Sequence, residues 1–203
     1  MPAPQWSPSA ERILRTAARL FAMHGYSATS TRDIAAAVGV QQPAIYKHFS
    51  AKDDILAALV KLGLEPPLTV ADSLDVVAAP AVVKMHRWLR ESLQHLLDSP
   101  YVLASILTTP ELERDRFAAE RKLIERLELQ VTDMIVQGQR EGDVRPVNPV
   151  SGARLVLVLF DAMALPEFAV SPPEIIDFAF TALLNDPSRL PELQRQANAL
   201  TLL

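Results

Sequence analysis

Cysteine is absent from this 203-residue chain. The absence excludes disulfides, thiolate metal sites and a cysteine nucleophile, and it suits a reducing compartment. Histidine is also scarce: His24, His48, His86 and His95 are scattered without the spacing of metal ligands. We therefore expect neither a metal site nor a cofactor.

Long apolar runs are missing as well. The most apolar run, 155–160, is followed by Asp161 and falls far short of the roughly 20 residues that a membrane span requires. The first nine residues lack a basic segment followed by an apolar one, so no signal peptide is expected. The composition predicts a cytoplasmic protein that does not contact a membrane.

Positive charge is in deficit over the whole chain, with a net charge of −4, but it is unevenly distributed. Residues 1–61 carry seven Lys or Arg side chains and four Asp or Glu, whereas the remaining residues carry 13 basic and 20 acidic side chains. A small basic part joined to a larger acidic part fits a protein that presents one end to phosphate.

Strand signals are poor, because no period-two alternation is sustained and no Asn-Gly or Asp-Gly hairpin occurs. Helical periodicity runs through most of the chain and predicts an all-α fold. The predicted helices are 9–24, 31–38, 42–48, 51–64, 80–97, 111–141 and 149–165, one from 172 onward, and shorter ones ending near 107 and following 187.

The helix lengths predict two domains. Short, closely spaced helices predict a small domain over residues 1–55, with helix 51–64 as the connector. Longer helices predict a larger helical domain over 56–203, to which the family resemblance described below assigns effector binding and dimerisation.

The first domain contains the pattern of a helix-turn-helix motif. Ser30 is suited to cap the helix that begins at Thr31, with Asp33 near its positive end. Gly39 permits the positive φ of a sharp turn. Apolar residues are expected to face inward, with Phe49 closing the core against Leu20 and Phe21: Ile34, Ala35, Val38, Val40 and Ile45.

Packing does not account for the residues on the opposite face of the second short helix. These are Gln41, Gln42, Pro43, Ala44, Tyr46, Lys47 and His48. Glutamine can bond adenine in the major groove, and proline or alanine can contact a thymine methyl. Tyrosine, lysine and histidine can reach phosphates or base edges. Lys52 begins the next helix, where its ammonium can pair with a phosphate. The alternative for each is an ordinary solvated surface.

These motifs resemble the N-terminal domain of the TetR (tetracycline repressor) family: Gly25-Tyr26, Thr29 to Ala35, Val38-Gly39-Val40, Ala44 to Phe49, and Lys52. The resemblance covers about residues 11–59. It implies that Thr31 and Arg32 meet phosphate and a base edge, and that an all-α C-terminal domain binds an effector within a homodimer. At position 44 the family usually has a small residue, often glycine or threonine, whereas this chain has alanine. The Ala44 side chain can therefore make only a methyl contact with DNA.

Two predicted helices of the larger domain have unusually wide apolar faces. Such helices are easier to bury in a chain of this length if one side meets another subunit. We therefore expect a symmetric dimer contact that includes Leu155 and Leu159 from one helix and Ile175, Phe178 and Ala182 from the other.

The effector pocket is harder to locate. Each candidate side chain is individually better explained as core packing, but as a group they are the best candidates for pocket walls, since methionine adapts to varied ligands. These residues are Met85, Trp88, Met134, Phe160, Met163 and Phe168. Walls of this kind suggest a moderately sized apolar or aromatic molecule.

The sequence thus predicts a repressor that binds a palindromic operator in double-stranded DNA as a homodimer and is released by a small effector. A DNA-binding regulator or activator without an effector is the alternative. An enzyme is disfavoured, and no catalytic residue is assigned, because the chain lacks a Gly-rich phosphate loop and a supported Ser/His/Asp arrangement.

Overall fold

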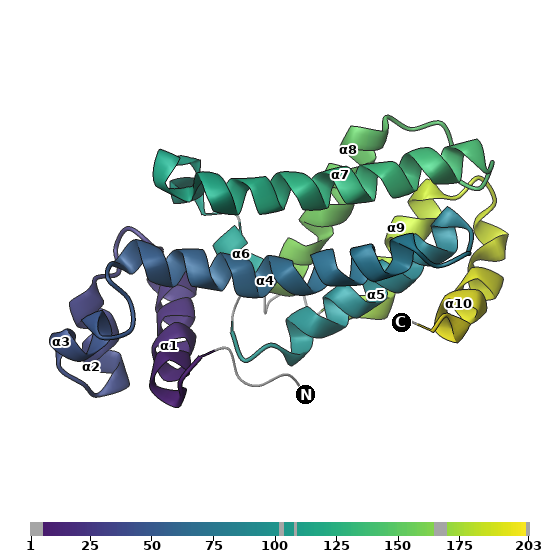
Figure 1. The fold of residues 1–203 in the computed structure, drawn as a ribbon. Coiled ribbons are helices and arrows are strands. Elements are labelled where there is room, and N and C mark those ends of the chain that lie inside the picture. Colours follow the sequence, from purple (N-terminus) through teal and green to yellow (C-terminus); the bar gives the residue numbers. More distant parts are fainter. Residues whose placement is uncertain (1–5, 102–103, 108, 165–169, 202–203) are drawn as a thin grey trace. The chain divides into compact units, whose positions relative to one another are not determined.

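Helices joined by turns and loops make up the residues that the computed structural model describes, which are 6–101, 104–107, 109–164 and 170–201 (Figure 1). The predicted all-α class is confirmed. The α-helices are α1 (Pro8–His24), α2 (Thr31–Val38), α3 (Gln42–Tyr46), α4 (Lys52–Asp75), α5 (Ala81–Asp98), α6 (Ala104–Leu107), α7 (Ala118–Arg140), α8 (Pro149–Val158), α9 (Pro172–Leu183) and α10 (Leu190–Ala199). Short 3₁₀ helices are η1 (Pro110–Glu113), η2 (Asp115–Phe117), η3 (Leu159–Ala164) and η4 (Pro187–Arg189).

The first helices begin and end where local chemistry predicts. Gly25 ends α1 with φ of 82°. Ser30 and Asp33 form a reciprocal capping box at the start of α2, each side chain accepting a hydrogen bond from the other residue's backbone N–H. Gly39 ends α2 in the left-handed conformation, with φ of 80°. Both glycine stops and the serine cap are therefore confirmed.

The fourth helix is longer than predicted. The sequence predicts its end at Leu64, before Pro66 and Pro67, but α4 continues to Asp75. A proline inside a helix costs about 3 kcal/mol or more because it removes a backbone donor and crowds the preceding turn. Burial offsets this cost, since each fully buried leucine contributes roughly 1.5–3 kcal/mol. The buried residues recur at helical spacing through the continuation and are Leu64, Leu68, Ala71 and Leu74.

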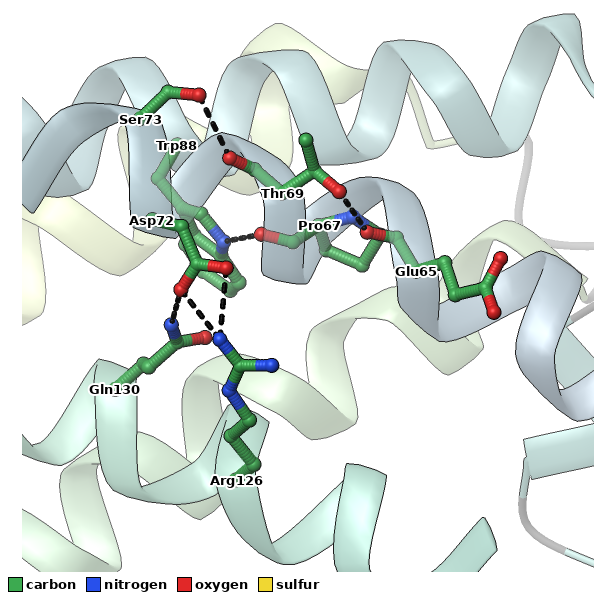
Figure 2. A network of polar contacts seen from close by, with 8 residues as sticks. All are labelled: Glu65, Pro67, Thr69, Asp72, Ser73, Trp88, Arg126 and Gln130. Atoms are coloured by element: carbon green, nitrogen blue, oxygen red, sulfur yellow. Dashed lines mark hydrogen bonds and ion pairs between the residues drawn. The ribbon is translucent and has the colours of Figure 1, made fainter.

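A polar network fastens the continuation of α4 to its neighbours (Figure 2). The fully buried indole of Trp88 on α5 donates a hydrogen bond from Nε1 to the Pro67 carbonyl, at 3.0 Å. The Asp72 carboxylate accepts hydrogen bonds from Arg126 and Gln130 of α7, each at 2.7 Å. Tertiary contacts thus hold α4 in helical form past its prolines.

Two other predicted helices change form along their length. The region predicted as one helix over 111–141 is η1, η2 and α7, because Arg114 has an extended backbone with ψ of 145°. Arg121 stabilises the break by donating to the carbonyls of Leu112 and Arg114, at 2.7 and 2.6 Å. The predicted helix 149–165 is α-helical only to Val158 and then becomes 3₁₀.

The chain divides into two compact units. One comprises Met1–Gly63 with Ser99–Arg121, and the other Leu64–Asp98 with Lys122–Leu203. The first unit includes the predicted DNA-binding region 1–55 and also 99–121, which the sequence assigns to the larger domain. Across the described ranges, no helix is both long and apolar enough to cross a bilayer.

His86 on α5 is a buried polar residue of the second unit. It is only 3% exposed, and neither ring nitrogen has a hydrogen-bond partner within the described structure. Its ring centroid lies 5.1 Å from that of Phe180 on α9. Burial, with a smaller contribution from the charge of Arg90, lowers the pKa of His86 to about 4. His86 is therefore neutral in the folded protein near pH 7.

Acidification should destabilise the fold through His86. The unfolded chain binds a proton there near pH 6.5 and the folded chain only near pH 4, so stability is lost as the pH falls through this window. The loss should be on the order of 1–2 kcal/mol at pH 5. Urea unfolding at pH 7 and pH 5 measures it, and the free energy of unfolding should fall less in the His86→Leu variant. An equal fall in both proteins would contradict the prediction.

Candidate nucleic-acid interface

The first three helices lie against one another (Figure 1) and bury a small apolar core. Leu14 of α1, Ile34 of α2 and Ile45 of α3 are completely buried. Phe49 is also buried, as predicted, but the ring it meets is that of Trp6, at a centroid distance of 5.6 Å. The ring of Phe21 instead meets Tyr26, edge-on at 5.0 Å. This core holds α2 and α3 in the arrangement of a helix-turn-helix.

The residues predicted to contact DNA lie largely at the surface of this unit. Gln42 and Ala44 of α3 and Thr31 of α2 are half-buried. The exposed ones are Arg32, Gln41, Pro43, Tyr46, Lys47 and His48. Contact with DNA by these side chains stays a prediction.

Four of these polar side chains form a hydrogen-bonded network between α2 and α3. The Gln42 amide donates from Nε2 to Thr31 Oγ1 at 2.8 Å and to Tyr46 OH at 3.2 Å. Its Oε1 accepts from Arg32 Nε at 3.3 Å. A side-chain amide has two donor hydrogens. Both are in use, so Gln42 must exchange at least one partner to donate to a base.

Lys52 begins α4, as predicted, and its side chain has partners within the protein. Its ammonium donates to the backbone carbonyls of Tyr26 and Thr29, both at 2.7 Å, and lies 4.0 Å from the centroid of the Tyr26 ring. Desolvation is the main cause that lowers the pKa of Lys52. Lys52 thus clamps the turn after α1 onto the start of α4. An ammonium has three donors, so the phosphate contact stays a prediction.

Tyr26 completes this clamp, a role that the sequence motif does not predict. Its hydroxyl donates a short hydrogen bond to the Asp53 carboxylate. Burial first, and the Asp53 contact second, raise the pKa of Tyr26. The only sequence signal was the position of the Gly25-Tyr26 pair, which does not reveal a contact made 27 residues later.

The segment from Pro110 to Arg121 adds a second set of polar contacts to the same unit. Arg116 lies between the two carboxylates at the start of α4, with Nε 3.3 Å from Asp53 Oδ2 and a shorter contact to Asp54. Ser27 donates to Glu111, and this bond is the main cause that lowers the pKa of that carboxyl. Sequence reasoning missed these contacts because partners more than 60 residues apart leave no local pattern.

The predicted effector residues are only partly brought together. Met85 and Trp88 are buried, and the Trp88 ring lies 5.8 Å from that of Phe160. Met134 instead lines a groove of about 630 Å³ with residues such as Lys84. The side chains of Met163 and Phe168 lie outside the described residues.

The predicted dimer residues divide into two groups. Leu155 of α8 and Phe178 of α9 are 69% and 67% exposed, Ala182 is exposed and Leu159 is half-buried. Ile175 is only 3% exposed, so its side chain belongs to the core of its own unit.

Comparison with known proteins agrees with the helix-turn-helix geometry. Residues 13–59 match the family described as bacterial regulatory proteins, tetR family. The uncharacterized HTH-type transcriptional regulator YerO of Bacillus subtilis (strain 168) is 44% identical over 46 residues, which cover 23% of this chain and 16% of that protein. The matches span less than two thirds of each of the curated relatives compared.

Similarity to solved structures extends over the whole chain. AmtR of Mycobacterium smegmatis has a TM-score of 0.78 at 28% identity, covering 100% of this chain and 99% of AmtR. AibR, solved in complex with isovaleryl coenzyme A and operator DNA, has a TM-score of 0.69 at 26% identity, covering 86% of this chain and 97% of AibR.

The clamp predicts that two nearby lysines have separable roles. Lys52→Met should lower the free energy of unfolding by about 1–3 kcal/mol, because two backbone carbonyls lose a charged donor. Lys47→Met is the matched control: Lys47 is exposed and has no polar partner among the described residues, so its removal should change stability by less than about 0.5 kcal/mol. Urea unfolding of the full chain measures both, and similar losses in the two variants would contradict the assignment.

Proposed function

The chain is a member of the TetR family of helix-turn-helix transcriptional regulators, and we propose that it is a repressor. In this proposal it binds a near-palindromic operator as a homodimer. A small apolar or aromatic molecule releases it from the DNA. The observation that carries the proposal is the outer face of α3. This short helix presents glutamine, proline, tyrosine and lysine side chains around Gln42 and Pro43, with Ile45 alone buried in the core.

Base reading falls to Gln42 and Pro43 in this proposal. The Gln42 amide can bond the N6 and N7 atoms of adenine, and the Pro43 ring can contact a thymine methyl. Thr31, Arg32 and Tyr46 already hold the amide by hydrogen bonds. When DNA enters, these three groups are free to turn to phosphate oxygens, so that Gln42 exchanges protein partners for a base edge.

Dimerisation uses the apolar face that α8 and α9 leave exposed. Leu155 and Val158 on α8 and Phe178 on α9 are 69%, 59% and 67% exposed. The two helices are neighbours, because a Cβ at Gly152 of α8 would lie 3.9 Å from Leu183 of α9. Contact with the same face of a second copy buries these side chains and sets two helix-turn-helix units on half-sites about 34–36 Å apart, or a multiple of that spacing.

An effector site in the second unit is supported by an unsatisfied polar group near large rings. Ser92 is only 3% exposed, and its hydroxyl has no hydrogen-bond partner within the described structure. Trp88 lies one turn earlier on α5 and contacts Phe160. An effector acts on the operator complex only through its differential affinity for the DNA-bound and free shapes.

A regulator or activator without an effector is the alternative. A thermal-shift screen of the full chain against apolar metabolites and drugs distinguishes the two. A compound that raises the melting temperature and also weakens operator binding supports the repressor. The absence of any such compound from a broad library favours the alternative.

Selection of bound fragments from a random DNA pool tests the proposed function. The parent protein should enrich a near-palindromic site. The Gln42→Ala variant should bind with reduced discrimination at one base pair in each half-site, by about 1–3 kcal/mol, because one bidentate contact is lost. Lys47→Met is the control and should weaken binding to all sequences alike. Enrichment of no site by the parent protein would contradict the proposal itself.

A charge placed on the exposed face of α8 or α9 should prevent dimerisation. Leu155→Glu and Phe178→Glu should each shift the protein to a monomer at micromolar concentration, since an unpaired carboxylate would be buried in the contact. Leu129→Glu is the matched control, because Leu129 is also an exposed apolar residue, at 60%, on α7. Sedimentation velocity measures all three. A monomeric parent protein, or a dimer that survives both substitutions, would contradict the assignment.

A further inference from the structure

A small basic hollow lies beside the recognition helix α3, on the side where it meets α1. Its volume is about 100 Å³, a few times the roughly 30 Å³ that a water molecule occupies in the liquid. Its lining residues come from α1, from the end of α2 and turn that follows, and from the segment 44–48. They are Ser9, Arg12, Ile13, Val38, Val40, Ala44, Lys47 and His48.

The polar side chains of this hollow suit an anion. Arg12 and Lys47 are cations, His48 adds a ring N–H, and no acidic residue lines the hollow. Ser9 lies in the first turn of α1, where backbone N–H groups lack helical partners and the helix end is positive. The hollow therefore gathers positive charge and donors without a carboxylate to neutralise them.

A hydrogen bond to the end of α2 holds the Arg12 side chain beside the hollow. One guanidinium nitrogen, Nη2, donates to the Val38 carbonyl at 3.0 Å, at the end of α2. A guanidinium has five N–H donors in a fixed plane, so the remaining donors are available. Because the side chain is already ordered, a further contact costs less conformational entropy.

The hollow lies on one flank of α3 and the polar network of Gln42 lies on the other. Gln42 and Tyr46 face Thr31 at the start of α2, whereas Ala44 and Lys47 face Val38 at its end and Arg12 on α1. A helix in the major groove has a phosphate strand on each side, since the groove is only about 12 Å wide. The two flanks therefore meet opposite strands.

We propose that the hollow lined by Arg12, Lys47 and His48 binds one backbone phosphate of the operator, on the strand opposite the one faced by the Gln42 network. The inference rests on the proposed function, and it extends the DNA contact to α1. Substitution of Arg12 tests this phosphate contact separately from base reading, because no base-reading role is assigned to that side chain.

The test is the salt dependence of DNA affinity for the Arg12→Gln variant, which keeps a side-chain donor for Val38 but removes the charge. The slope of log K against log salt concentration should become shallower by about 0.9, the value for one phosphate contact on B-DNA. Between 50 and 200 mM salt the variant should lose about 3-fold less affinity than the parent. The change should be equal on operator and on unrelated DNA, because a phosphate carries no sequence information.

Arg145→Gln is the control for a general loss of positive charge, since Arg145 is exposed in the second unit and should leave the slope unchanged. An unchanged slope for Arg12→Gln with a lower melting temperature would show that Arg12 only supports α2, and would overturn the inference. If inorganic phosphate raises the melting temperature of the parent but not of the variant, and the slope is unchanged, the hollow binds free anions instead. A parent protein that binds no DNA would fail the proposed function itself.

Discussion

The clamp formed by Lys52 is the contact on which the arrangement of the DNA-binding unit depends. One ammonium binds two carbonyls of the turn between α1 and α2, and it also covers the Tyr26 ring, whose hydroxyl is bonded to Asp53. The turn and the first residues of α4 are thereby joined from both sides. Since α2 leaves this turn directly, the direction of the whole helix-turn-helix follows from it. Lys52 thus has a structural role in the free protein, apart from any contact with phosphate.

The helix α4 carries a second constraint, because one continuous element belongs to both compact units. Its two prolines follow Gly63, the last residue that the first unit takes from α4. Beyond them the helix is maintained by leucine burial and by the bond from Trp88 to the Pro67 carbonyl. Weak intrinsic helicity in the middle of α4 is therefore compensated by packing in the second unit, and the same buried tryptophan meets Phe160 in the region where an effector is proposed.

The polar outer side of α3 is ordered by hydrogen bonds whose partners can be exchanged. Both donor hydrogens of the Gln42 amide are bonded in the free protein, and its oxygen accepts one bond, which limits the rotamers of the side chain. The partners are polar side chains that can themselves bond phosphate, so the exchange leaves no buried group unpaired. Most of this surface was predictable from sequence, since a face with no packing role is visible once Ile34 and Ile45 are assigned to the core. The hydrogen-bond network within it was not, because it joins two helices through side-chain geometry.

The sequence alone determined the features that have local causes. These are the all-helical class, the serine cap and glycine stops, and the polar outer face of α3. Each of these features depends on residues within about one turn of one another, so a short stretch of sequence is enough to predict it. Only the tertiary structure decided that Lys52 clamps a turn, that α4 passes through its prolines, and that Ile175 faces inward while Phe178 faces out. These outcomes depend on burial and on partners distant in sequence, which the local pattern does not encode.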